Sequence, residues 1–367
     1  MNDWHFRTQR PQQLALALAR RGHRCFYVNP HLGRQFPHPV RFSRTPVYGT
    51  LAPNIWEIHA GLNAEPVFHH RRLTLGESRN LASQLTQAAR DFQFQNLRIV
   101  SQFPLWNDCA WQLRRQLQAP VLYDCHDLLS GFSNISPEII DDEVILFQQA
   151  DSVVFSAKSL LEKKIAEMPW LGEKARLVPN GVDVSRFALA AGGGTATAAP
   201  RPIAGYAGAI DEWFDWRAVE AAARANPGCD FVLLGRIDNK DALRLGELPN
   251  VRLYGEIPYS AVPEYMAQFR IGLIPFHVNE LTLATNPIKL FEYFSCGLPV
   301  VSSALPEVAA YRDHVYLSHT PAEFAAQVTA ALTEDSPERR RRRHDVALGA
   351  SWENRATDLL AQASAAE

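Results

Sequence analysis

Residues 286–303 have the sequence Asn286-Pro287-Ile288-Lys289-Leu290-Phe291-Glu292-Tyr293-Phe294-Ser295-Cys296-Gly297-Leu298-Pro299-Val300-Val301-Ser302-Ser303. This order predicts a short helix, a turn and a buried strand. Pro287 suits the first helical turn, where its missing N–H costs no hydrogen bond. Gly297 is a helix stop, and Pro299 opens the apolar pair Val300-Val301, which is typical of a parallel strand. The stretch therefore predicts an α/β fold.

The same predicted helix carries two charged residues that could bind a ligand. Lys289 and Glu292 are three residues apart, so they lie on one face near the helix N-terminus. Free N–H groups and the helix dipole favour an anion at that end. A lysine adds a point charge for a phosphate, and a carboxylate can accept hydrogen bonds from two sugar hydroxyls. These residues alone fit a nucleotide-sugar site and an ordinary surface helix with one ion pair equally well.

Outward from this stretch, predicted strands alternate with predicted helices along nearly the whole chain. This alternation is typical of doubly wound sheets with helices on both faces. The expected strands are 24–29, 97–101, 120–124, 152–156, 175–178, 202–206, 230–234, 251–254, 271–275 and 300–302. The expected helices are 9–21, 73–95, 108–117, 138–150, 157–166, 216–225, 240–245, 262–268 and 288–295.

The chain of 367 residues is long enough for two domains. Residues 188–202 are rich in Ala, Gly and Thr, which is typical of a flexible linker. We therefore expect an N-terminal domain over 1–185, a linker over 186–202 and a C-terminal domain over 203–350. A terminal helix over 351–367 is expected to cross back toward the N-terminal domain.

Composition limits the partners. The net charge is −2, which gives no overall signal for nucleic acid, and Arg339 to Arg343 is expected to be a solvated helix face. Residues 1–90, however, hold twelve arginines, no lysine and four acidic residues, an excess of eight positive charges. That half is expected either to face an anionic membrane or a lipid-diphosphate acceptor, or to be a basic surface that the rest of the chain balances.

The cysteines and the hydropathy pattern indicate a compartment. Five cysteines without a Cys-x-x-Cys pair indicate reduced, mostly buried thiols. No apolar run reaches the ~18 residues of a membrane span. The N-terminus has no charged region followed by an apolar one, as a signal peptide would. The sequence predicts a cytoplasmic protein, peripheral at most at the inner face of the membrane.

The motif at 286–303 resembles the donor-site helix of GT-B glycosyltransferases, in particular the large retaining group called family 4. Its Asn-Pro-x-Lys-x-x-Glu-Tyr string is similar to that of the teichuronic-acid-type branch, and Pro179-Asn180-Gly181-Val182-Asp183 is similar to the hinge-proximal motif of these enzymes. The resemblance extends from about Trp4 to Trp352. It implies two Rossmann-like domains facing a central cleft.

The resemblance also implies a function. The protein would move a sugar from a nucleoside-diphosphate sugar, most often a UDP-sugar, to a glycan or lipid-diphosphate-linked acceptor. The reaction would serve cell-surface polysaccharide synthesis, retain the anomeric configuration, and need neither a metal nor another cofactor. The resemblance places Lys289 at the donor diphosphate and Glu292 at the nucleotide ribose. The other donor-binding residues it implies are Gly208, Asp211, Arg236, Ile257, Phe276 and Asn286.

The N-terminal half supplies the remaining candidates. His126, Asp127 and Asp124 follow the strand 120–124, and the resemblance places the histidine near the reacting sugar. The two carboxylates could serve as a base or stabilise positive charge at the anomeric carbon. The alternative is that these polar residues cap the next helix, and their spacing fits no familiar structural zinc site. Arg10 and Gln12 are expected at the acceptor.

Three departures from the family keep alternatives open. Ala284 stands where many members have a sugar-binding glutamate, the loop after residue 206 has no cation before Arg217, and the usual first strand is expected to be missing. An inverting transferase with Asp124 or Asp127 as base therefore remains an alternative. So does a non-catalytic nucleotide- or glycan-binding member. A Rossmann-type dehydrogenase is disfavoured, since no Gly-x-Gly-x-x-Gly motif is present.

Overall fold

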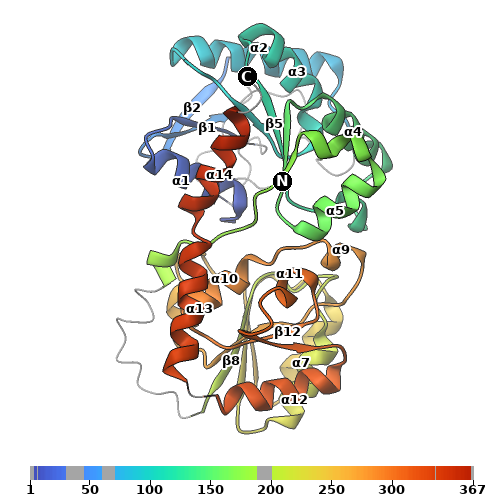
Figure 1. Ribbon diagram of the computed structural model, residues 1–367, viewed down its shortest axis with the longest axis vertical. Helices are drawn as coiled ribbons and strands as arrows, with labels where there is room; N and C mark the ends of the chain where they lie inside the picture. The colour runs from blue at the N-terminus through green and yellow to red at the C-terminus, as the bar shows by residue number, and fades with distance from the viewer. Residues whose placement is uncertain are drawn as a thin grey trace. The chain divides into compact units, whose positions relative to one another are not determined.

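The computed structural model describes residues 4–5, 7–29, 45–59, 71–187, 201–334 and 336–364. The chain forms two compact units (Figure 1). Unit 1 comprises Met1–Pro179 and Glu353–Glu367, and unit 2 comprises Asn180–Trp352. The sequence placed the boundary a few residues later and predicted a linker after it, but most of that linker lies outside the described residues.

Unit 2 is built on one sheet of six parallel strands in the order β10-β9-β8-β11-β12-β13. The first strand of the unit, β8, lies in the middle. The order therefore reverses between β8 and β11, the switch point at which doubly wound sheets bind ligands. The strands are β8 (Ile203–Ala207), β9 (Asp230–Leu234), β10 (Val251–Gly255), β11 (Ile271–Ile274), β12 (Val300–Ser303) and β13 (Val315–Ser318).

Helices connect these strands and cover the sheet (Figure 1). Strands β11 and β12 are buried along their whole length, which explains their continuous apolar sequences. The helices are α7 (Trp216–Ala225), α8 (Val262–Met266), α9 (Glu280–Leu283), α10 (Ile288–Ser295), α11 (Pro306–Ala309), α12 (Pro321–Leu332) and α13 (Pro337–Gly349), with the 3₁₀ helix η4 (Lys240–Glu247). The predicted helix at 288–295 matches α10 at both ends.

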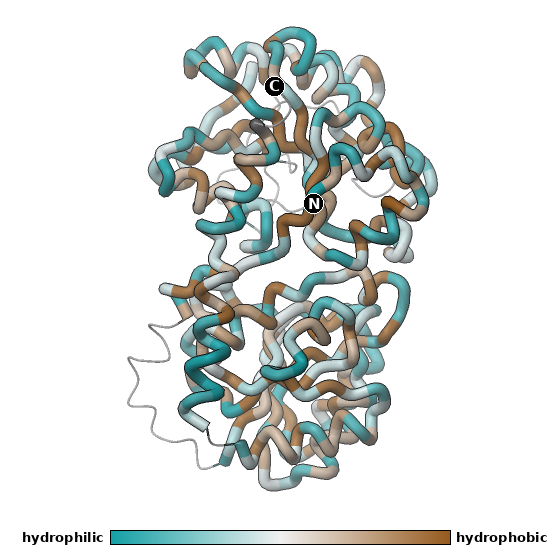
Figure 2. The backbone as a smooth tube through the Cα atoms, in the orientation of Figure 1, coloured by the Kyte–Doolittle hydropathy of each residue, from teal (hydrophilic) through white to brown (hydrophobic). Residues whose placement is uncertain are grey.

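The arginine run lies on α13, which Figure 2 shows as a hydrophilic helix. Arg339 to Arg342 are exposed, as expected for a solvated face, but Arg343 is only 1% exposed. Its guanidinium donates to both carboxylate oxygens of Glu334, at 2.7 and 3.0 Å. The end of the run therefore stabilises the unit and is not available to nucleic acid.

Unit 1 contains two separate sheets in its described part. One is the parallel sheet β4-β5-β6-β7, and the other is β1-β3-β2, in which β2 runs antiparallel to β3. The strands are β1 (Cys25–Val28), β2 (Val47–Ala52), β3 (Ile55–His59), β4 (Ile99–Ser101), β5 (Val121–Cys125), β6 (Ser152–Phe155) and β7 (Ala175–Leu177).

Within the described ranges no strand joins β1 to β4. That the usual first strand is missing stays a prediction. Strand β1 is half-buried along its length, and Val100 of β4 is 41% exposed. Strands β5 and β6 are fully buried by comparison. The helices of the unit are α1 (Arg10–Arg20), α2 (Leu75–Asp91), α3 (Asn107–Leu117), α4 (Pro137–Gln149), α5 (Lys158–Glu167) and α14 (Trp352–Ser364), with the 3₁₀ turns η1 (Pro104–Trp106), η2 (Leu129–Gly131) and η3 (Pro169–Glu173).

Helix α14 begins at the end of unit 2 and, from Glu353 on, belongs to unit 1. Arg20 of α1 and Glu353 form an ion pair of 2.6 Å. No helix within the described ranges is long and apolar enough to cross a lipid bilayer.

Candidate functional site

The ammonium group of Lys289 lies at the switch point of the unit 2 sheet. Its Nζ is 5.2 Å from the centroid of the Tyr206 ring, at the end of β8, and 4.7 Å from that of Phe276, just after β11. These two strands flank the reversal of strand order. Lys289 also stands in the first turn of α10, so its charge adds to the dipole of that helix.

Burial sets the charge state of this lysine. Desolvation lowers the pKa of Lys289 to about 8, and the nearby Glu292 carboxylate opposes that shift only in part. Aromatic faces attract a cation but accept no strong hydrogen bond from it. The ammonium group therefore keeps hydrogen-bond donors available for an anionic ligand.

Close packing fixes helix α10 on the sheet. The Tyr293 ring is fully buried and lies directly over Gly272 of β11, where a Cβ atom would come within 2.4 Å of the ring. The Tyr293 hydroxyl accepts a hydrogen bond from Ala207 N at 3.1 Å and lies 3.3 Å from Gly205 O. Helix α10 can therefore approach the sheet closely only because residue 272 is a glycine.

Three glycines mark the carboxyl ends of neighbouring strands of the unit 2 sheet, and one of them, Gly208, lies beside Lys289. Gly208, Gly235 and Gly255 have φ values of 154°, 149° and 72°, at or just past the ends of β8, β9 and β10. Gly208 N donates to Leu234 O, and Gly235 N donates to Gly255 O at 2.7 Å. A Cβ on Gly208 would come within 3.3 Å of Lys289 Nζ. This edge exposes backbone that a ligand can approach closely.

Glu292 lies on the same helix, and its side chain is 6% exposed. The Tyr259 hydroxyl donates to Glu292 Oε1 at 2.8 Å. Burial raises the pKa of Glu292, while the hydrogen bond from Tyr259 and the charge of Lys289 lower it. Tyr259 therefore orients the Glu292 carboxylate, a hydrogen-bond acceptor on the same helix as Lys289. Such an acceptor can bind a sugar hydroxyl.

The other predicted donor-binding residues occupy the same edge of the unit 2 sheet. Asn286 is buried, and its backbone oxygen accepts from Asn180 Nδ2 at 2.7 Å. Arg236 is 44% exposed and pairs with Asp238 at 2.5 Å. Burial raises the pKa of the nearby Asp211. Ile257 is half-buried and packs against the core of the unit.

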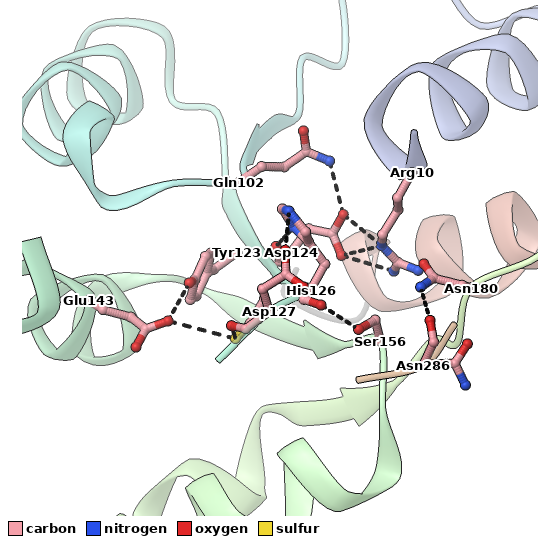
Figure 3. A network of polar contacts seen from close by, with 11 residues as sticks. Arg10, Gln102, Tyr123, Asp124, His126, Asp127, Glu143, Ser156, Asn180 and Asn286 are labelled. Atoms are coloured by element: carbon pink, nitrogen blue, oxygen red, sulfur yellow. Dashed lines mark hydrogen bonds and ion pairs between the residues drawn. The ribbon is translucent and has the colours of Figure 1, made fainter. Parts of the chain in front are cut away.

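In unit 1, Asp124 forms the centre of a buried network (Figure 3). It is 0% exposed, and Arg10 Nε donates to both of its oxygens at 2.9 and 3.0 Å. Gln102 Nε2 donates to Oδ2 at 2.9 Å. Burial alone would raise the pKa of Asp124, but Arg10, with smaller contributions from His126 and Gln102, outweighs it, and the pKa is lowered. A carboxylate held this way makes a poor base.

Arg10 and Gln12 have structural partners that the sequence interpretation did not assign. Both are 2% exposed. Arg10 also donates to Pro179 O at 3.1 Å, so it ties α1 to the end of unit 1. Gln12 Oε1 accepts from Gln9 N, and its Nε2 donates to Arg7 O, so it caps the start of α1. The acceptor contacts predicted for them stay a prediction.

His126 and Asp127 remain accessible beside this network. Their side chains are 17% and 37% exposed, and His126 Nε2 lies 3.4 Å from Asp127 Oδ2. His126 Nδ1 lies 3.2 Å from Asp124 O, and Ser156 Oγ donates to His126 O at 2.8 Å (Figure 3). The buried pair therefore fixes the backbone that presents an accessible histidine and carboxylate.

Several residues of these arrangements were missed from the sequence. Tyr206, Tyr259, Gly235 and Gln102 contribute contacts that only the folded chain brings together. Gly235 had a detectable signal, since it follows an apolar strand as Gly208 does. In the part of the chain that the structure describes, no three His, Cys, Asp or Glu side chains gather as metal ligands would.

Two glycosyltransferase models match the two halves of the chain. Residues 11–186 match the model of Glycosyltransferase Family 4, and residues 214–361 match a Glycosyl transferase-like model. A Bacillus subtilis (strain 168) protein named as a teichuronic acid biosynthesis glycosyltransferase, TuaH, is 28% identical over 253 residues. That match spans 63% of this chain and 64% of the Bacillus protein.

Solved structures share the fold at low identity. Anabaena Alr3699/HepE in complex with UDP and glucose has a TM-score of 0.62 at 15% identity, over 84% of this chain and 86% of its own. A trehalose 6-phosphate synthase from Burkholderia multivorans has a TM-score of 0.67 at 15% identity, over 96% and 94%. A glycosyltransferase from Rickettsia africae has a TM-score of 0.69 at 12% identity, over 96% and 93%.

Proposed function

Because this chain belongs to the glycosyltransferases of the GT-B fold, we propose that it transfers a sugar from a nucleoside-diphosphate sugar to a glycan or lipid-linked acceptor. The observation that carries the proposal is Lys289, a half-buried cation in the first turn of α10 at the switch point of the unit 2 sheet. The Bacillus relative's name directs the proposal toward cell-surface polysaccharide synthesis.

Unit 2 would hold the donor. Lys289 and the free N–H groups of α10 would bind the diphosphate and stabilise it as it leaves, since preformed charge and dipoles favour developing negative charge. Glu292 would accept hydrogen bonds from the ribose. The backbone at Gly208, Gly235 and Gly255 would let the nucleotide lie against the strand ends.

Unit 1 would supply the groups for the reacting sugar and the acceptor. We assign His126 and Asp127 to this task, since both are accessible at the end of β5. Asp124 is assigned to hold them in place, because Arg10 occupies both of its oxygens. Retention at the anomeric carbon is proposed from the family resemblance. Proton NMR of the product decides it, and an inverted anomer would make Asp127 the proposed base.

A donor screen tests the proposal. UDP, GDP and dTDP are added to the wild type, Lys289→Ala and Glu292→Ala, and the unfolding midpoint is recorded. UDP comes first because the Anabaena structure holds it. A nucleotide well above its dissociation constant should stabilise the wild type by a few kcal/mol. The two variants should lose that gain, whereas Lys240→Ala, which removes an exposed lysine, should keep it.

Two outcomes would change the proposal. If no nucleotide stabilises the wild type, the donor site is wrong. If a nucleotide binds but no sugar is transferred or hydrolysed from any UDP-sugar, the non-catalytic alternative replaces the transferase. We also propose that transfer needs no divalent metal, because Lys289 and the α10 N-terminus supply positive charge. Activity lost in EDTA and restored by Mg²⁺ or Mn²⁺ would contradict this.

The acceptor and membrane proposals rest on the basic N-terminal region. Several of its arginines are paired with carboxylates from later in the chain, as Arg72 is with Asp142 at 2.7 Å. Arg21, Arg79 and Arg90 are exposed and would meet an anionic surface. Flotation with vesicles of phosphatidylglycerol should carry the protein at low salt and release it at high salt. A protein that stays in solution at both would leave a water-borne glycan as the proposed acceptor.

A further inference from the structure

The Glu292 carboxylate is held by a second residue. Tyr259 lies beyond the end of β10, 33 residues before Glu292, and its hydroxyl donates to Glu292 Oε1 at 2.8 Å. Neither the family resemblance nor the comparisons give this tyrosine a role. Glu292 is 6% exposed, so few arrangements of its carboxylate fit the space around it.

The Tyr259 ring is itself fixed. The guanidinium carbon of Arg186 lies 5.0 Å from the ring centroid, and the Phe187 ring meets it edge-on at 6.2 Å. Burial, and then the charge of Glu292, raise the pKa of Tyr259 well above its ordinary value. The phenol therefore keeps its proton and remains a donor to the carboxylate.

We infer that Tyr259 is a positioning residue that aims the Glu292 carboxylate at the ribose hydroxyls of the donor nucleotide. A glutamate side chain has considerable rotamer freedom, and fixing it before the ligand arrives reduces the entropy lost on binding. With Oε1 engaged by Tyr259, Oε2 and the second lone pair of Oε1 remain as acceptors. The pair thereby selects nucleotides that carry ribose hydroxyls. This inference rests on the proposed donor site.

The test compares two nucleotides that differ only in the sugar. Dissociation constants for UDP and 2′,3′-dideoxy-UDP are measured by calorimetry on the wild type, Tyr259→Phe and Glu292→Gln. If the donor screen selects guanine, GDP and its dideoxy form take their place. The wild type should prefer UDP by roughly tenfold or more, the value of a hydrogen bond to a charged group. Tyr259→Phe should reduce that preference to about threefold or less, with affinity for the dideoxy nucleotide unchanged.

Tyr254→Phe is the matched control. Tyr254 is 51% exposed, its ring packs on Tyr265, and it also belongs to the β10 region. The Tyr254→Phe variant also loses a tyrosine hydroxyl, but one that does not contact Glu292. Its preference for UDP over the dideoxy nucleotide should therefore equal that of the wild type. Unfolding midpoints of both variants, measured without nucleotide, show that each is folded.

The outcomes separate this inference from the proposed function. If Tyr259→Phe weakens both nucleotides equally, Tyr259 acts only through packing and the inference fails, while the donor site stands. An unchanged preference for UDP in Tyr259→Phe overturns the inference in the same way. If the wild type binds no nucleoside diphosphate at all, the donor site itself is wrong, and the inference falls with it.

Discussion

The ammonium group of Lys289 lies 4.7 Å from the centroid of the Phe276 ring. Lys289 belongs to α10 and Phe276 follows β11, and the contact keeps the lysine over the switch point of the sheet. An aromatic face compensates a half-buried cation only in part, and desolvation lowers the pKa of Lys289 to about 8. The lysine is therefore mostly charged at neutral pH and loses its charge just above it.

The first prediction is a pH dependence of donor binding. The protonated form of Lys289 should bind the diphosphate, and UDP itself is mostly ionised above pH 7. As the pH rises through 8, the ammonium loses its proton, so affinity for UDP should fall about tenfold between pH 7 and pH 9. Calorimetry in matched buffers measures the dissociation constant of UDP at each pH.

Lys289→Arg is the control for this pH dependence, because an arginine stays protonated throughout this range. Where the variant binds UDP, its affinity should not change from pH 7 to pH 9. A wild-type affinity that is equally flat over this range would show that Lys289 keeps its proton or does not meet the phosphates.

Patterns in one segment predicted much of the fold. The helix 288–295 and the strand after it were predicted almost to the residue, because Pro287 and Gly297 mark the two ends of the helix. The hairpin β2–β3 was missed. Its turn depends on Asn54, a non-glycine residue at φ 63°, and its register is fixed by packing that no local pattern shows.

The candidate site was predictable only in part. The sequence predicted an anion site at Lys289 and Glu292, because the two residues lie on one face of a helix near its N-terminus. The partners of Asp124 could not be predicted, since Arg10 lies 114 residues away in the chain. Burial converts such polar residues from candidate catalysts into structural ones, and burial is a property of the whole fold.

The second prediction concerns the buried pair of Arg10 and Asp124. Arg10→Met should destabilise unit 1 by about 3–5 kcal/mol, because it leaves a carboxylate buried without its partner. Asp124→Leu should have a similar effect, because it leaves the Arg10 guanidinium buried without its partner. The double variant should cost clearly less than the sum of the two, as measured by urea unfolding. Additive losses would show that the two side chains do not depend on one another.

The third prediction is an acid-sensitive contribution from Glu334. Burial would raise its pKa, but hydrogen bonds from Arg343, Tyr316 and Arg339 outweigh that effect and lower the pKa to about 2. A carboxylate with a depressed pKa stabilises the fold above its unfolded pKa of about 4.5, and this contribution is lost as the pH falls toward 2.

Glu334→Gln should therefore lower the unfolding free energy by about 2 kcal/mol at pH 7, and the difference from the wild type should shrink below pH 4. Glu338→Gln, which breaks an exposed pair with Arg342, should change stability by less than about 0.5 kcal/mol. Urea unfolding at pH 3 and pH 7 measures both. A loss for Glu334→Gln that is the same at both pH values would contradict the role of its charge.

The fourth prediction concerns the backbone beside Lys289. Gly235 has φ 149°, and a Cβ at this position would lie 1.8 Å from Gly208 O. Gly235→Ala must therefore push the ends of β8 and β9 apart. Since Gly208 borders Lys289, donor binding should suffer along with stability. We expect a loss of more than about 2 kcal/mol in unfolding free energy, and UDP affinity at least about tenfold weaker.

Gly228→Ala is the matched substitution. Gly228 lies in the turn before β9, and a Cβ there would meet nothing within 4 Å. This variant should unfold and bind UDP as the wild type does. If Gly235→Ala also bound UDP normally, the strand ends would tolerate displacement, and the close backbone approach between Gly208 and Gly235 would not shape the donor site. If Gly235→Ala instead lost UDP binding while its stability stayed unchanged, the added Cβ would be occupying space that the nucleotide needs.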